Sequence, residues 1–286
     1  MPYLRRIYRL PAELEESLVA DLWQAGTLGV STESEPDGRL RLTAWVGSRE
    51  SSAAPAPLPA CECLSEDELP DTDWMAEYRR QAVPFPLGRT LLIDPREPEA
   101  SSVAAPVPAG RRLLRLPART AFGIGSHEST ALALELLEAA ELAGRSVLDV
   151  GTGTGILAFA ALAWGAARVV AFDADPVAVV QARANSRLNG LHPRLFAGRA
   201  AALAPPSEAA DRFELIIVNV VPEEILPDLA DLLPLLAPLG TLILSGLLAE
   251  RAAEVSALLA ARGLVEIGHP LVSGEWTALR LSWARP

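Results

Sequence analysis

The sequence contains no lysine: all 25 of its basic residues are arginine. Mechanisms that need a lysine Schiff base or the lysine of a phosphate-binding loop are therefore excluded. Cysteine is also scarce, because Cys61 and Cys63 are the only two in 286 residues. Two thiols one residue apart, with no histidine nearby, cannot complete a tetrahedral zinc site. We therefore expect no metal centre.

Long hydrophobic runs are missing, although half of the residues are hydrophobic. No uncharged apolar run reaches the roughly 18 residues of a membrane span, and the first ten residues lack the apolar core of a signal peptide. Positive charge is in deficit as well, with a net charge of −11 at pH 7. Such a chain is poorly suited to neutralise nucleic-acid phosphates and would attract a basic partner. We expect a cytoplasmic monomer that neither enters a membrane nor reads nucleic acid.

The chain length favours two domains. Residues 3–10, 11–26, 28–31 and 40–46 have the patterns of a strand, a helix and two further strands, as in half of a ferredoxin-like domain. Residues 47–70 are rich in Ser, Ala, Pro and acids, which is typical of a linker or exposed loop, and a short helical pattern follows at 71–82. We predict a small N-terminal α/β domain at 1–60, a linker with a short helix at 61–95, and a larger domain at 96–286.

Helical and extended patterns alternate regularly from residue 128 onward. The central extended segments are continuous apolar runs such as LIIV and LILS, which indicate strands buried on both faces of a mainly parallel sheet. The last two have no helix between them and should be antiparallel. The pattern predicts a seven-strand Rossmann-like α/β sheet, with strands at 146–150, 168–173, 194–197, 214–219, 241–245, 264–267 and 276–283. Helices are expected at 129–143, 156–166, 176–188 and 249–262, with another from Pro222.

A glycine-rich turn joins the first of these strands to its helix. The segment DVGTGTG carries Asp149, Gly151, Gly153 and Gly155, and Asp173 ends the next strand. Glycines let a ligand approach the backbone closely, and the start of the helix offers free N–H groups. The carboxylate at 173 can accept hydrogen bonds from both hydroxyls of a ribose. The arrangement predicts a nucleoside-bearing cofactor, with Asp149 near its cationic end.

The glycine spacing separates two classes of cofactor. Dinucleotides use G-x-G-x-x-G, whereas this chain has G-x-G-x-G, with Ile156 at the place of the third dinucleotide glycine. A dinucleotide also places its pyrophosphate at the helix N-terminus, while S-adenosylmethionine has a sulfonium and no phosphate. The pattern favours S-adenosylmethionine and methyl transfer over a nucleotide oxidoreductase. Glycines in a purely structural turn are the remaining alternative.

Two further segments carry candidate site residues. His127 lies in a loop that Gly123 and Gly125 would make bendable, as a lid requires, although the residues from 126 to 129 could equally provide only a helix cap. Asn219 ends a central strand, at the edge where ligands bind in open α/β sheets. Its amide could hold an amine, or it could cap the helix that begins at Pro222.

The segments FGIGSHEST, DVGTGTG, DADP, VNVVPEEI and GEWTALRL, in this order, resemble the methyltransferases of the eleventh protein of the bacterial large ribosomal subunit (the PrmA family). The resemblance is strong from about residue 70 to the end. It implies cofactor contacts at Thr130, Gly151, Asp173 and Asn219, with Asn219 where methyl donor and acceptor amine meet. It also implies an N-terminal domain that recognises a basic ribosomal protein, of which lysine side chains and the N-terminal amine are methylated. The lid departs from the family pattern at Ile124 and Ser129.

Under this hypothesis Asn219 positions the acceptor amine, and His127 contributes to lid closure or relays a proton. Alternative acceptors are another protein, a small-molecule amine or a nucleic-acid base. Base-amine methyltransferases commonly carry N-P-P-Y or D-P-P-Y where this chain has N-V-V-P, which offers no aromatic ring to stack on a base. A ribosome-assembly factor that keeps the fold and binds nothing is the alternative outside enzymes.

Overall fold

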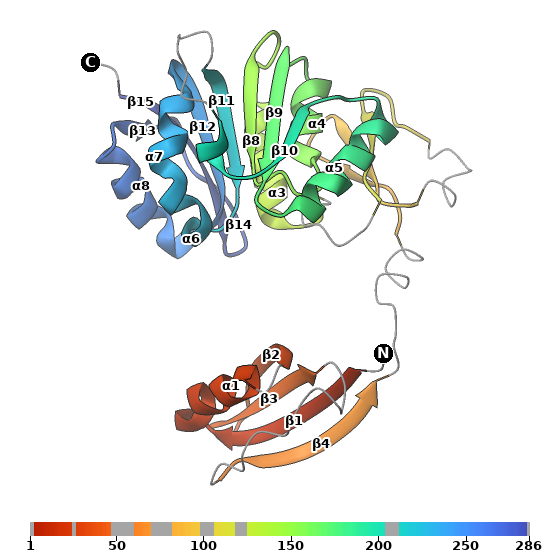
Figure 1. Ribbon diagram of the computed structural model, residues 1–286, viewed down its shortest axis with the longest axis vertical. Helices are drawn as coiled ribbons and strands as arrows, with labels where there is room; N and C mark the ends of the chain where they lie inside the picture. The colour runs from red at the N-terminus through yellow and green to blue at the C-terminus, as the bar shows by residue number, and fades with distance from the viewer. Residues whose placement is uncertain are drawn as a thin grey trace. The chain divides into compact units, whose positions relative to one another are not determined.

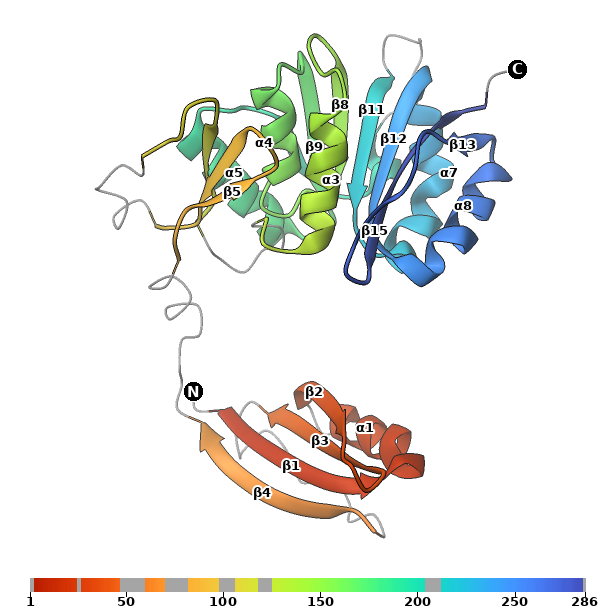
Figure 2. The same ribbon diagram turned by 180° about the vertical axis from the view of Figure 1, so that it is seen from behind.

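The computed structural model describes residues 3–24, 27–46, 60–69, 82–97, 106–117, 125–203 and 212–284. The chain divides into two compact units, Met1–Trp74 and Met75–Pro286, each of which is drawn from two sides in Figures 1 and 2. Residues 71–81 of the helix expected at 71–82, and the lid residues 120–124, lie outside the described residues. Within the described part, no helix combines the length and apolarity needed to span a membrane.

The first unit is an antiparallel sheet with a helix packed on one face. Its strands are β1 (Tyr3–Pro11), β2 (Thr27–Ser34), β3 (Arg39–Val46) and β4 (Glu62–Leu69), in the order β2-β3-β1-β4. A 3-10 turn at Ala12–Leu14 leads into α1 (Glu15–Gln24). Alternate residues of β1 and β3 point to the helix, and their core with α1 contains Tyr8, Leu10, Leu18, Leu22, Leu40, Leu42 and Ala44.

Strand β4 corrects the predicted domain boundary at residue 60, because it pairs with β1 inside the first unit. Its sequence, ECLSEDEL, has no apolar alternation. As an edge strand it is held partly by ion pairs from β1: Arg5 to Asp67 at 3.0 Å and Arg6 to Glu66 at 2.8 Å. Charged edge strands are common in sheets, and hydrophobic periodicity does not detect them. The completed order β4-β1-β3-β2 is that of a whole ferredoxin-like sheet, not half of one.

The second unit is built on a sheet in the order β10-β9-β8-β11-β12-β15-β13. Strands β8 to β12 are parallel, and β15 runs antiparallel to both β12 and β13. A further strand, β14 (Leu271–Ser273), also pairs with β15, so the described sheet has eight strands where seven were predicted. Its three residues lie in a short connection without a pattern of their own. The other bounds are β8 (Ser146–Val150), β9 (Arg168–Asp173), β10 (Arg194–Ala197), β11 (Phe213–Asn219), β12 (Leu236–Leu248), β13 (Leu264–Glu266) and β15 (Trp276–Trp283).

Helices α4, α5 and α6 start where predicted and α3 starts one residue earlier, whereas α8 starts at Ala252, after a 3-10 turn at the predicted start of 249. Helix α3 ends at Glu138, not at 143, and the helix expected from Pro222 is divided into α6 and α7 by a 3-10 turn. Pro227 lies in that turn and Pro234 in a second 3-10 turn that follows α7, and each removes a backbone donor. The bounds are α3 (Glu128–Glu138), α4 (Ile156–Ala163), α5 (Pro176–Asn189), α6 (Pro222–Ile225), α7 (Leu229–Leu232) and α8 (Ala252–Ala260).

The central strands are buried on both faces, as their apolar runs predicted. On β11, Ile217 packs into a core that includes Leu134 of α3 and Phe159 of α4, the two helices in front of the sheet in Figure 2. Its neighbour Val218 belongs to the opposite core with Leu232 of α7 and Leu259 of α8, which lie in front in Figure 1. The sheet is therefore the middle layer of three.

A separate small sheet extends the core on the α3 and α4 side. It contains β5 (Phe85–Leu87), β6 (Leu91–Asp94) and β7 (Arg112–Arg115), and its Leu91, Ile93 and Leu114 are buried in the same core. Thr90 Oγ1 donates to Glu138 at the end of α3, and Trp164 Nε1 donates to Thr90 Oγ1 at 2.8 Å. Residues 85–94, predicted as linker, thus belong to the second unit.

Candidate functional site

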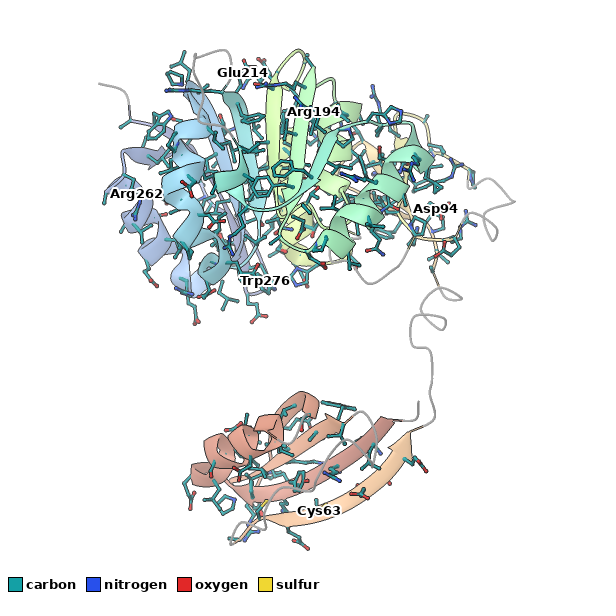
Figure 3. The ribbon with its side chains drawn as sticks, in the orientation of Figure 1. Cys63, Asp94, Arg194, Glu214, Arg262 and Trp276 are labelled. Atoms are coloured by element: carbon teal, nitrogen blue, oxygen red, sulfur yellow. The ribbon has the colours of Figure 1, made fainter. Side chains whose placement is uncertain are left out.

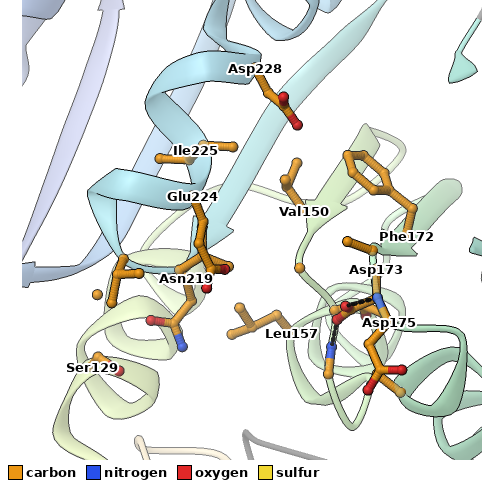
Figure 4. Close-up of a pocket in the computed structure, with 18 of the residues that line it drawn as sticks. Ser129, Val150, Leu157, Phe172, Asp173, Asp175, Asn219, Glu224, Ile225 and Asp228 are labelled. Atoms are coloured by element: carbon orange, nitrogen blue, oxygen red, sulfur yellow. Dashed lines mark hydrogen bonds between the residues drawn. The ribbon is translucent and has the colours of Figure 1, made fainter. Parts of the chain in front are cut away.

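A cavity of about 780 Å³ opens at the carboxyl ends of β8, β9 and β11 (Figure 4). This volume lies in the range of small-molecule sites, about 300–1,000 Å³. The chain leaves β8 toward β9 and β10 on one side, while β11 and β12 lie on the other. The cavity is therefore at the topological switch point, where open α/β sheets bind ligands.

The glycine-rich turn forms one wall of the cavity. Gly151, Gly153 and Gly155 have φ angles of 69°, 53° and 89°, in the left-handed region that favours glycine. A Cβ on Gly151 would lie 2.4 Å from Val220 Cγ1, and one on Gly155 would lie 2.5 Å from the Phe159 ring. Gly151 and Gly153 line the cavity, whereas Gly155 lies behind them as the N-cap of α4. Gly155 therefore allows the backbone conformation of the turn and does not itself face a ligand.

Replacing Gly155 with alanine should lower the free energy of unfolding by about 2–4 kcal/mol, because left-handed strain and overpacking against Phe159 add together. Gly190 is a matched control, since it ends α5 with φ of 62° and a Cβ there would meet nothing within 4 Å. Gly190→Ala should cost only the strain, about 1 kcal/mol. Urea unfolding of both variants measures the difference, and equal losses would show that the contact with Phe159 is unimportant.

Asp173 ends β9 and lines the cavity beside the turn. One carboxylate oxygen accepts the Gly153 N–H at 2.9 Å and the other accepts the Asp175 N–H at 2.9 Å. The first of these bonds ties the glycine turn of β8 to the tip of β9. A carboxylate has roughly four lone-pair sites, so an oriented acceptor remains available for two hydroxyl groups.

Asp149 is fully buried and does not belong to the cavity lining. One of its oxygens accepts hydrogen bonds from Thr152 Oγ1 at 2.6 Å and from the Ala158 N–H at 3.1 Å. Burial raises the pKa of its carboxyl to about 7, and the two hydrogen bonds oppose that rise. The structure thus places Asp149 behind the glycine turn, where it supports the turn and the start of α4, and not at the wall that a ligand would touch.

Asn219 and Thr130 form a buried pair on the other side of the cavity. Asn219 Nδ2 donates to Thr130 Oγ1 at 3.1 Å, and the Asn219 Oδ1 atom has no partner among the described residues. Asn219 lines the cavity, while Thr130 is completely buried and reaches the site only through the amide. The alternative role of Asn219 as a helix cap is not observed, because Val221 is the N-cap of α6 and no side chain caps that helix.

His127 is the N-cap of α3 and also lines the cavity. Its Nδ1 accepts the Ser129 N–H at 3.2 Å, which assigns the proton of the neutral ring to Nε2. The ring stands edge-on to Trp276, 4.8 Å between centroids. Trp276, labelled in Figure 3, begins β15 and is a lining residue that we did not predict as a site residue. Only the fold brings this distant strand to His127.

The lining is acidic. Its carboxylates belong to Asp173, Asp175, Glu224 and Asp228, and Arg199 is the one arginine among the lining residues of the described chain. The Arg199 guanidinium is already engaged, since Nε lies 2.9 Å from Asp228 and Nη2 donates to the Glu224 carbonyl at 3.2 Å. The cavity therefore suits a cation better than a pyrophosphate. Arg199, Glu224 and Asp228 were not predicted as site residues: Arg199 and Asp228 belong to no motif, and Glu224 lies in VNVVPEEI without a role assigned to it.

Comparisons with known proteins agree with this geometry. The family model described as Ribosomal protein L11 methyltransferase (PrmA) matches residues 52–283. The ribosomal protein L11 methyltransferase of Geobacter metallireducens is 40% identical over 228 residues, which cover 79% of this chain and 70% of the relative. That of Synechococcus elongatus is 35% identical over 283 residues, which cover 93% and 92% of the two chains.

Among solved structures, the ribosomal protein L11 methylase of Lactobacillus delbrueckii subsp. bulgaricus is similar to this chain with a TM-score of 0.61 and 30% identity. The match covers 71% of this chain and 99% of that one. Sequence and structure comparisons thus point to one family over most of the chain, and the family model spans residues 75–283 of the cavity-bearing unit. The chain belongs to the ribosomal protein L11 methyltransferase (PrmA) family.

Proposed function

We propose that this protein transfers methyl groups from S-adenosylmethionine to amines of ribosomal protein L11, namely lysine side chains and the N-terminal amine. The observation that carries the proposal is the cavity: the glycine turn and Asp173 share one wall, Asn219 stands across from them in Figure 4, and the lining is acidic. The proposal includes a cytoplasmic monomer that reads no nucleic acid. The N-terminal unit is assigned to recognition of the substrate protein.

The residues of the cavity fit S-adenosylmethionine by their chemistry. Asp173 offers oriented carboxylate oxygens to the ribose hydroxyls, and Gly151 and Gly153 leave the backbone open to close approach. The acidic lining suits a ligand with an ammonium and a sulfonium group, and its one arginine is engaged by Asp228. When bound, S-adenosylmethionine supplies an electrophilic methyl group.

Asn219 is proposed to orient the acceptor amine. Because Nδ2 is held by Thr130, Oδ1 is the amide atom left to accept an amine N–H. A free lysine amine has a pKa of about 10.4 and reacts only when neutral, so displacement of water from the cavity would favour the reactive form. Alignment of nitrogen, carbon and sulfur supplies a further rate advantage.

His127 is better suited to hold the lid than to accept a proton. Its Nδ1 lone pair is occupied by the Ser129 N–H, and Nε2 carries the proton of the neutral ring. A base would need a free ring nitrogen. We therefore propose that His127 fixes the start of α3, together with its ring contact to Trp276, and leaves proton transfer to water.

The test is methyl transfer to the purified substrate. Incubation of the full-length protein with labelled S-adenosylmethionine and a ribosomal protein extract should label one band, identified as L11 by mass spectrometry. Calorimetry should detect S-adenosylhomocysteine binding and no binding of NADH. A chain that binds NADH instead, or that labels a different protein, would disprove the assignment.

A further inference from the structure

We propose that Glu224 contacts the acceptor amine and selects a cationic one, because its carboxylate stabilises positive charge at the acceptor nitrogen before and during methyl transfer. This inference rests on the proposed function and adds a residue to it. Glu224 lies in the segment VNVVPEEI, but no role was predicted for it, and the fold of α6 places it in the cavity lining.

The first observation concerns the partners of the lining carboxylates. Within the described residues, Glu224 is the one lining acid whose side chain has no hydrogen bond or ion pair. The other three are engaged: Asp173 by the N–H groups of Gly153 and Asp175, Asp175 by the N–H of Val177 at 2.8 Å, and Asp228 by Arg199. Exposed carboxylates without a partner are common on protein surfaces. The role of Glu224 therefore has to be judged from where its side chain lies.

The backbone of Glu224 is held firmly beside the cavity. Its N–H donates to the Val221 carbonyl at 3.1 Å, and its carbonyl accepts Arg199 Nη2 at 3.2 Å. Figure 4 shows the side chain pointing from α6 toward Asn219. In this view the Glu224 carboxylate lies on the Asn219 side of the cavity, across from Asp173.

The second observation is independent of charge. Asn219 is 9% exposed, and its Oδ1 atom is buried without a partner among the described residues. A buried polar atom without a partner is costly, and Asn219 is a lining residue, so a ligand that donates a hydrogen bond to Oδ1 would remove that cost. An amide oxygen and a carboxylate at one end of a cavity call for a group with several N–H donors and a positive charge. A lysine ammonium has three donors.

The charge balance of methyl transfer makes the carboxylate useful beyond binding. The bound ammonium first gives one proton to water, which frees the lone pair of the nitrogen. That lone pair then forms the new N–C bond, the C–S bond breaks, and its electron pair stays on sulfur. Positive charge therefore moves from sulfur to nitrogen, and the new ammonium later loses a proton to water if it still carries one. A carboxylate beside the nitrogen is attracted more strongly in the transition state than to the neutral amine, which speeds the reaction.

Glu223 provides a matched control on the same helix. It is adjacent in sequence, and its side chain pairs with Arg251 and does not line the cavity. Glu223→Gln removes the same charge at nearly the same place in the chain, but outside the site. A general effect of net charge would therefore appear in both glutamine variants, whereas contact with the amine would appear only in Glu224→Gln.

The experiment measures kcat and KM for methylation of intact L11 by the full-length protein and its Glu224→Gln, Glu224→Asp and Glu223→Gln variants. We expect Glu224→Gln to lower kcat/KM at least tenfold through both constants, Glu224→Asp to restore part of the loss, and Glu223→Gln to match the wild type. Calorimetry with S-adenosylhomocysteine should give affinities within about twofold of each other, which also shows that the variants are folded.

Three results would overturn the inference. Equal kcat/KM for the two glutamine variants would mean that Glu224 does not contact the amine. Loss of S-adenosylhomocysteine binding in Glu224→Gln would make Glu224 a cofactor or structural residue. A wild-type protein that binds S-adenosylhomocysteine and leaves L11 unlabelled would overturn the proposed function, and the inference with it.

Discussion

Asp173→Ala should weaken S-adenosylhomocysteine binding by about two to four orders of magnitude. The carboxylate is proposed to accept hydrogen bonds from both ribose hydroxyls, and hydrogen bonds to charged groups contribute about 1.5–3 kcal/mol each. Two such bonds amount to about 3–6 kcal/mol, and each 1.4 kcal/mol changes affinity about tenfold. Isothermal titration calorimetry measures the loss directly.

The structure gives a second reason to expect Asp173→Ala to weaken S-adenosylhomocysteine binding. Asp173 also accepts the N–H groups of Gly153 and Asp175, so its removal loosens the turn that faces the ligand. Asp173→Asn separates the two effects, because one amide oxygen can still accept a hydrogen bond while the charge is gone. We expect an intermediate affinity for that variant. An affinity for Asp173→Ala equal to that of the wild type would rule out the ribose assignment.

Asn219→Ala should reduce kcat at least a hundredfold and change S-adenosylhomocysteine affinity only a few-fold. The amide oxygen is proposed to hold the acceptor amine in line with the methyl group, and misplacement by about 1 Å can cost a hundredfold in rate. Single-turnover methylation of L11 separates this chemical step from binding. Full activity in the variant would show that Asn219 does not position the amine.

Thr130→Val is the control for this effect. It keeps Asn219 but removes the hydroxyl that accepts from Nδ2, so the amide can rotate. We expect a smaller loss of kcat than for Asn219→Ala, since the oxygen is still present for part of the time. Thr130 is fully buried and outside the cavity lining, so a loss of turnover would have to act through the amide.

These predictions divide the cavity into two ends. Asp173 and the glycine turn are assigned to the nucleoside, whereas Asn219 and Glu224 are assigned to the acceptor, and Figure 4 shows the two sets on opposite sides. Variants at the first end should change cofactor affinity, and variants at the second should change turnover on L11. A mixed pattern would mean that the two ends are assigned wrongly.

The central sheet could be predicted closely because its signals are local. Strands β8, β9, β10 and β15 have the predicted bounds. Buried strands of a parallel sheet consist of continuous apolar residues, and the turns between them carry glycine, proline or a capping acid. The end of β9 follows from the same local signals, so the sequence predicted correctly that Asp173 ends this strand.

Strands β4 and β14 could not be predicted, because each is defined by its partner. The acidic residues of β4 pair with arginines of β1 about sixty positions away, and β14 is three residues long against β15. Neither has a hydrophobic period of its own. Contacts over such separations become visible only when the chain is folded.

The layered sheet, the glycine turn and the acid that ends the next strand follow from the sequence, since each depends on a local pattern of residue types. Which acids face the cavity depends on how the folded chain packs. This packing places Asp149 behind the turn, turns Glu223 toward Arg251 and leaves Glu224 in the lining. Side-chain direction on a short helix depends on how that helix packs, and residue type alone does not encode it.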